Sequence, residues 1–232
     1  MPKFTPYLFV ALLSLLFSTA SLGTTQIDQH IQQLMDMAIA GKDKEFLQIV
    51  DDNQLINKID KNGHTPLFVA LFGSPTLVAD VIQRGSNVQH KDSNSMTPLI
   101  SASMLGYHQA VKLLLEKGAD VNDTMTDGNP ALKVAIVSAS ANALPTENKY
   151  HHKFDETVQE LISHGAEVNI LDHYGAPLLL YPVFNKNYAI CEILLKAKAD
   201  PNFIYKNSSM LTIARHFSSP KIVELLKQYG AK

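Results

Sequence analysis

Apolar residues along positions 96–122 recur with the spacing of two short helices joined by a tight link. Thr97 precedes Pro98, an order that favours a helix start because the threonine hydroxyl can cap free backbone N–H groups and proline has no N–H to satisfy. Gly118 can take the left-handed conformation that ends many helices. We therefore predict a helix, a link at Leu105 and Gly106, a second helix and a glycine stop. The inward-facing positions are Leu99 and Ala102 in the first helix and Val111, Leu114 and Leu115 in the second.

The glycine stops mark a repeat of about 33 residues. Gly85 and Gly118 are 33 residues apart. Gly165 and Lys198 are also 33 apart, and Gly230 follows 32 residues later. The gap from Gly118 to Gly165 is 47 residues, which is 14 more than one period. The spacing therefore predicts stacked helix pairs, with an insertion near residues 142–153.

Two motifs occur together at this period: T-P-L, which begins at Thr97, and G-A-D-V-N, which begins at Gly118. This combination resembles the ankyrin repeat family, in which a β-turn is followed by two antiparallel helices. The resemblance covers roughly residues 27–232 and implies an all-α solenoid of about six repeats, including caps, with short β-turn fingers. Within a domain at 21–232, the expected units are a capping repeat at 27–59 and repeats at 60–91, 92–125, 126–171, 172–204 and 205–232.

Several copies depart from the family pattern. Ser95 and Lys198 stand where the pattern has glycine, and a left-handed backbone at Lys198 costs about 1 kcal/mol relative to glycine. Pro130 and Pro177 stand one place early, where a threonine should cap the helix. Pro182 lies inside a predicted first helix and should kink or shorten it.

The first 20 residues have the order of a secretory signal peptide. Lys3 is their only charge, residues 8–17 are almost entirely apolar, and Ala20 ends a run of small residues. An uncleaved membrane anchor is the alternative, but an apolar run of about ten residues is too short to span ~30 Å of hydrocarbon. We expect cleavage after Ala20 and a periplasmic or secreted protein.

Composition narrows the classes of function. The 232 residues carry a formal net charge of −2, which predicts no electrostatic attraction to nucleic acid or anionic lipid. The single cysteine, Cys191, falls among apolar positions of a second helix, where we expect a buried, inert thiol. We find no motif of a nucleophilic hydrolase, a zinc protease or a phosphate-binding loop, so we expect no enzyme activity, cofactor or metal. His151 and His152 lie in the insertion without a third ligand, which favours a solvated loop over a metal site.

The family resemblance implies where a partner binds. Partners of ankyrin proteins usually contact the concave face, made by the finger tips and the exposed side of each first helix. Large apolar side chains there are typical of interface centres, although Phe72 and Leu105 could instead fill the groove between neighbouring helices as core. The candidate contact residues are Lys61, Asn62, His64, Phe72, Ser93, Asn94, Met96, Met104, Leu105, Asp127, Asn129, His173 and Tyr174.

These observations predict a non-enzymatic, monomeric binding protein that holds a protein partner. A sharper version is an inhibitor or immunity protein of a toxin enzyme that acts in the periplasm, because a rigid prefolded surface loses little ordering entropy on binding. The alternatives are a periplasmic scaffold that supports a stress or redox enzyme, and a secreted effector that acts on host proteins. The insertion at 142–153 is either a second contact site or a loop that the fold tolerates.

Overall fold

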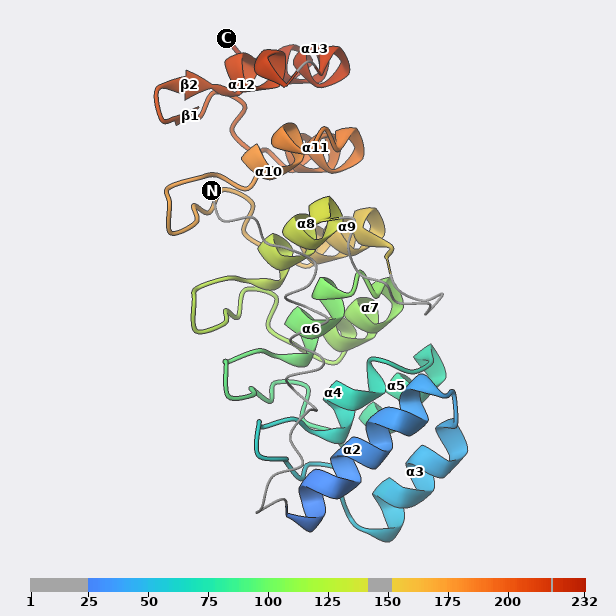
Figure 1. Cartoon of the computed structure of the whole chain (residues 1–232). Coiled ribbons are helices and arrows are strands. Elements are labelled where there is room, and N and C mark those ends of the chain that lie inside the picture. The colour runs from blue at the N-terminus through green and yellow to red at the C-terminus, as the bar shows by residue number, and fades with distance from the viewer. Residues whose placement is uncertain (1–24, 142–151, 218) are drawn as a thin grey trace.

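The computed structural model describes residues 25–141, 152–217 and 219–232, and its helices pair and stack into one elongated array (Figure 1). The predicted signal peptide and residues 142–151 of the predicted insertion lie outside the described residues. The all-α stack of six helix pairs is confirmed within the described part of the chain. The pairs are α2 (Gln26–Ile39) with α3 (Asp43–Asp52), α4 (Pro66–Ala70) with α5 (Pro75–Gln83), α6 (Pro98–Met104) with α7 (His108–Glu116), α8 (Ala131–Ala141) with α9 (Phe154–Ser163), α10 (Leu180–Phe184) with α11 (Tyr188–Lys196), and α12 (Met210–His216) with α13 (Pro220–Gln228).

Hydroxyl side chains cap several helix starts. Thr97 Oγ1 accepts a hydrogen bond from Ile100 N at 3.2 Å, as the T-P-L motif predicts. α2 begins one residue earlier than predicted because Thr25 N donates to Asp28 Oδ2 at 2.7 Å and Asp28 N donates to Thr25 Oγ1 at 3.1 Å. Thr65 precedes α4 but makes no such bond, and its hydroxyl is buried without a hydrogen-bond partner. The motif therefore starts α4 through Pro66 alone.

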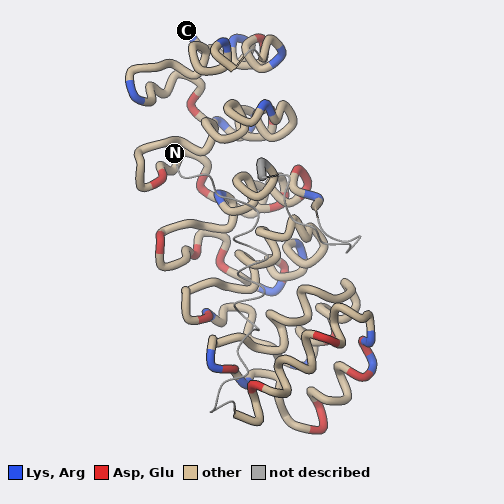
Figure 2. The backbone as a smooth tube through the Cα atoms, viewed as in Figure 1, with Lys and Arg blue, Asp and Glu red and all other residues tan. Residues whose placement is uncertain are grey.

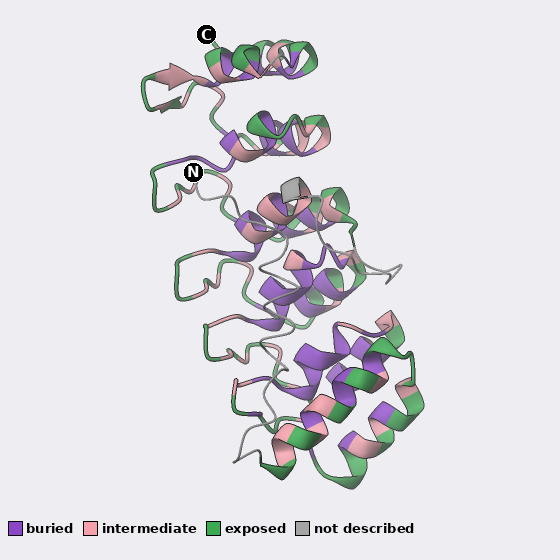
Figure 3. Cartoon of the chain, viewed as in Figure 1, coloured by how far each residue is buried: buried purple, intermediate pink, exposed green. Residues whose placement is uncertain are grey.

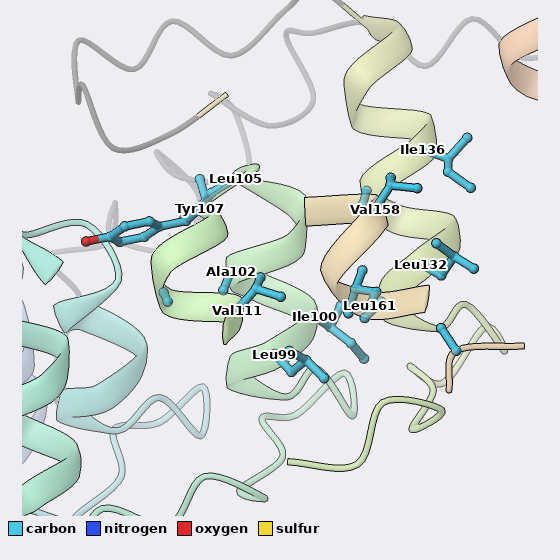
Figure 4. Packing of buried hydrophobic residues seen from close by; sticks show 14 of the residues in the cluster. Leu99, Ile100, Ala102, Leu105, Tyr107, Val111, Leu132, Ile136, Val158 and Leu161 are labelled. Atoms are coloured by element: carbon cyan, nitrogen blue, oxygen red, sulfur yellow. The ribbon is translucent and has the colours of Figure 1, made fainter. Parts of the chain in front are cut away.

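The core runs through the array between the two layers of helices, and Figure 3 shows the buried residues gathered there. The first helix of each repeat packs against the first helix of the next, and the second helices do the same. Figure 4 shows Leu132 and Ile136 of α8 beside Val158 and Leu161 of α9, and all four side chains are buried. The leucines at the end of the T-P-L position are buried in all five repeats that follow the cap: Leu67, Leu99, Leu132, Leu179 and Leu211.

A ladder of side-chain amides links each repeat to the next. Asn122 Nδ2 donates to Gly165 O at 3.1 Å, and Asn122 Oδ1 accepts from Glu167 N at 3.0 Å. Each amide therefore satisfies a carbonyl at the next helix stop and an N–H two residues later. The same two bonds occur at the other ladder positions, which are Asn57, Gln89, Asn169 and Asn202. The recurring amide side chain fixes neighbouring repeats to each other.

The predicted departures from the family pattern are visible in the backbone. Ser95 and Lys198 have φ values of +60° and +67°, so both occupy the left-handed region without being glycine. Pro182 lies in α10, which is only five residues long, in agreement with the predicted shortening. Pro130 directly precedes α8 and therefore takes the place of a capping side chain.

Candidate functional site: the concave face

Five fingers project from one side of the stack, each before a first helix (Figure 1). In three of them, one aspartate fixes the tip. Asp60 Oδ1 accepts hydrogen bonds from Asn62 N and His64 N, both at 2.8 Å. Asp92 in the second finger and Asp172 in the fourth make the equivalent pair of bonds. These tips therefore have a fixed backbone shape without any partner.

The third and fifth fingers are built differently. Met125 replaces the aspartate in the third finger, where Asp127 Oδ1 instead accepts from Asn129 N at 3.2 Å. In the fifth finger, β1 (Ile204–Tyr205) pairs antiparallel with β2 (Ser208–Ser209). Lys206 and Asn207 join the strands with φ values of +46° and +63°, as a two-residue hairpin turn requires. This hairpin is not among the features predicted from the sequence, although Asn207, a residue that tolerates positive φ, indicates a turn.

Most of the predicted contact residues are exposed or half-buried. Tyr174 is the largest of the exposed ones, with 56% of its surface accessible, and its ring centroid lies 3.7 Å from that of His173. That these predicted residues contact a protein partner stays a prediction. The exposed residues are Lys61, Ser93, Asn94, Asp127, His173 and Tyr174, and the half-buried ones are Asn62, Phe72, Met96, Met104 and Asn129.

The prediction for His64 as a contact residue is wrong, because the residue is only 6% exposed. His64 Nδ1 lies 3.1 Å from Asp60 Oδ2, and its Nε2 lies 3.9 Å from Asp92 Oδ2. Burial opposes the ionisation of Asp60, but hydrogen bonds from the His64 side chain and backbone outweigh it and hold the pKa of Asp60 below its ordinary value. The imidazole therefore links the first two fingers internally.

The prediction for Leu105 is also wrong, because this residue is 1% exposed and belongs to the core (Figure 4). Phe72 is half-buried and packs against the same core, in line with the alternative stated for both residues. The Leu105–Gly106 link is covered by the end of the insertion. His152 N donates to Leu105 O and Lys153 N donates to Gly106 O, both at 2.9 Å. The link is therefore a contact between repeats.

Three exposed apolar residues were missed by the sequence analysis. Ile59, Leu171 and Ile204 are 49%, 51% and 59% exposed, and each stands immediately before the first residue of a finger. Leu171 and Ile204 are 33 residues apart, so they occupy the same place in neighbouring repeats. This shared position could have indicated their exposure from the sequence, because a residue next to an exposed finger tip is itself exposed.

A polar cluster lies beneath the fourth finger. Tyr181 Oη, from α10, donates to Asp172 Oδ2 at 2.6 Å. Burial opposes the ionisation of Asp172, but this bond, two backbone N–H groups and the positive charge of Lys133 outweigh it, so the pKa of Asp172 lies below its ordinary value. Burial, followed by the bond to Asp172, raises the pKa of Tyr181 well above its ordinary value. The cluster therefore holds one negative charge at neutral pH and braces the base of the finger.

Other candidate chemistry is sparse in the parts of the chain that the structure describes. No group of three or more His, Cys, Asp or Glu side chains is placed to hold a metal ion among these residues. Nor does a helix within them combine the length and apolar character needed to cross a membrane. Cys191 is buried, which confirms the predicted burial of this thiol, and burial raises its pKa to about 12. Figure 2 shows basic and acidic residues interspersed along the described array.

Comparison with known proteins gives one consistent result. A family model described as ankyrin repeats in three copies matches residues 69–145. The crystal structure of an ankyrin repeat domain from Acinetobacter baumannii superposes with a TM-score of 0.69 at 29% identity, over 86% of this chain and 98% of that one. An ankyrin repeat protein of fowlpox virus is 32% identical over 130 residues, which are 54% of this chain and 34% of the viral one. The human ankyrin repeat and KH domain-containing protein 1 is 31% identical over 51% of this chain, which spans only 4% of its length.

Proposed function

Because this chain belongs to the ankyrin repeat family, we propose that it is a non-enzymatic protein that binds a protein partner on its concave face. Ankyrin repeats are generally protein–protein interaction modules, and proteins built from them are typically not enzymes. The same family membership leaves the identity of the partner open, because function depends on the side chains displayed by the scaffold.

The observation that carries the proposal is the display of Tyr174 on a braced finger. The ring is 56% exposed, while the backbone around it is held by two bonds to Asp172, which is itself bonded to Tyr181. Tyrosine is enriched at the centres of protein interfaces. A tip that is already ordered loses little conformational entropy on binding, which favours tight association.

We also propose that the chain is exported and acts in the periplasm or outside the cell. The support is the composition of residues 1–20, with one charge and an apolar run at 8–17. Cell fractionation followed by N-terminal sequencing tests this proposal. A periplasmic or secreted protein that begins at Ser21 supports export, whereas a cytoplasmic protein that retains residues 1–20 refutes it.

Within this function, inhibition of a periplasm-acting toxin enzyme is the sharper proposal. Affinity purification from the native envelope fraction, with residues 21–232 as bait, tests both the binding of a partner on the concave face and the inhibition of a toxin enzyme. Tyr174→Asp should lose the partner, whereas Tyr188→Asp should retain it, because Tyr188 is comparably exposed at 41% but begins a second helix away from the fingers. Equal retention by both variants contradicts the concave-face assignment. If the partner is a hydrolase, loss of its activity at one equivalent of this chain supports inhibition, and unchanged activity refutes it.

A further inference from the structure

The first three fingers are hydrogen-bonded to one another through their backbones. Ser93 N donates to Asn62 O, and Thr126 N donates to Asn94 O, each at 3.1 Å. The side-chain hydroxyls of the same two residues reach the same carbonyls, at 2.7 Å from Ser93 and 2.9 Å from Thr126. The second position of a finger therefore pairs with the third position of the finger before it.

This ladder ends after the third finger. His173 and Lys206 occupy the second position in the fourth and fifth fingers. Among the described residues, no hydrogen bond joins His173 N to Asp127 O or Lys206 N to Tyr174 O. Neither side chain carries a hydroxyl that could reach the preceding finger as Ser93 does. In the described part of the chain, His173 N and Lys206 N therefore lack the bond to the preceding finger that Ser93 N and Thr126 N make.

Exposed apolar side chains lie beside these unpaired backbone groups. Leu171 directly precedes the fourth finger, Ile204 lies at the start of the fifth, and Tyr174 is an exposed residue at the tip of the fourth. The residues at the place of Leu171 in the second and third fingers are Lys91 and Thr124, which are polar. The fourth and fifth fingers therefore display apolar side chains at a place where the second and third fingers are polar, whereas the first finger has Ile59 there.

We propose that the fourth and fifth fingers bind an extended strand of the protein partner, with apolar side chains at alternate positions. An extended segment offers free N–H and C=O groups along its edge, and its alternate side chains reach one face together. A helical segment has already used its backbone groups internally, so it cannot pair with His173 N or Lys206 N. This inference rests on the proposed function and specifies the conformation of the bound segment.

A short peptide of alternating threonine and valine residues, with a lysine at each end, tests the proposal on residues 21–232. Hydrogen exchange resolved at single amides should slow by about tenfold or more at His173 and Lys206 when the peptide is added. The same peptide with every second backbone nitrogen methylated should give no protection, because it cannot pair along that edge. Leu171→Asp combined with Ile204→Asp should also abolish the protection.

Ile59→Asp is the matched control. Ile59 has the same place and similar exposure at the first finger, where Asn62 O is already taken by Ser93 N. Binding that survives this change and is lost in the double variant supports the proposal. The proposal is overturned if the peptide does not slow hydrogen exchange at either amide of the wild type, or if Ile59→Asp abolishes the slowing as fully as the double variant does. The peptide experiment needs no native partner, so its failure is distinguishable from failure of the affinity purification.

Discussion

Replacement of Asn122 by alanine should weaken the contact between the second and third repeats. The change removes two hydrogen bonds, from Asn122 Nδ2 to Gly165 O at 3.1 Å and from Glu167 N to Asn122 Oδ1 at 3.0 Å. A net contribution of about 0.5–1.5 kcal/mol per bond gives a loss of about 1–3 kcal/mol in the free energy of unfolding. We expect the lower half of that range, because these groups are exposed and water can replace the lost partner.

Urea unfolding of residues 21–232, followed by circular dichroism, measures this loss from the shift in midpoint. Asn53→Ala is the matched control, because Asn53 Nδ2 donates to Ile49 O at 3.0 Å within the end of a single helix. The control removes an exposed amide bond without removing a link between repeats. If Asn122→Ala alone shows a second unfolding transition, or a smaller slope of the unfolding free energy against urea concentration, the repeats before and after Asn122 unfold separately.

The reasoning fails if Asn122→Ala costs less than about 0.5 kcal/mol, or if its cost equals that of Asn53→Ala. Either result would mean that the apolar core between the helix layers supplies all the coupling between repeats. The ladder amides would then be a consequence of the stacking and not a cause of it.

Three further predictions follow from single residues. Lys198→Gly should raise the free energy of unfolding by about 1 kcal/mol in urea melts, because φ at Lys198 is +67°, whereas Gly165→Ala at the same register should lower it. Cys191 should resist thiol reagents in the native protein and react once urea unfolds it, since burial raises its pKa to about 12. Tyr181→Phe removes the hydrogen bond to Asp172 and should lower the free energy of unfolding at neutral pH. The difference in this free energy between the variant and the wild type should shrink as the pH falls from 3.8, the ordinary pKa of an aspartate, through the lower pKa that Asp172 has in the folded protein. The sign follows because a carboxyl group with a lowered pKa in the folded state stabilises the fold only while it is ionised. Thermal melts at a series of acidic pH values measure this difference, and a difference that does not change with pH would contradict the prediction.

The sequence predicts features that depend on local chemistry. Gly118 and Lys198 stop helices because the backbone reverses there, and the register of the stops reveals this without any knowledge of neighbours. Burial on the finger side depends instead on the adjacent repeat. His64 is enclosed by Asp92 from the next finger, and Leu105 is covered by the segment that carries His152. A single repeat considered alone cannot show either contact, so the sequence predicted a surface position for His64 and left a core position for Leu105 as an alternative.

The two halves of the concave face differ in how they satisfy their backbone groups. In the N-terminal half, Ser93 and Thr126 join the fingers by hydrogen bonds, and the buried His64 ring lies between Asp60 of the first finger and Asp92 of the second. In the C-terminal half, the fingers have their internal bonds, but among the described residues no backbone bond joins His173 N or Lys206 N to the preceding finger. Since a repeat array gains stability from each neighbouring contact separately, this opening weakens the C-terminal fingers without weakening the N-terminal ones. A strand bound between the open fingers would complete the ladder and would therefore stabilise the C-terminal repeats selectively, by about 2.7 kcal/mol at a peptide concentration of 100 times its Kd.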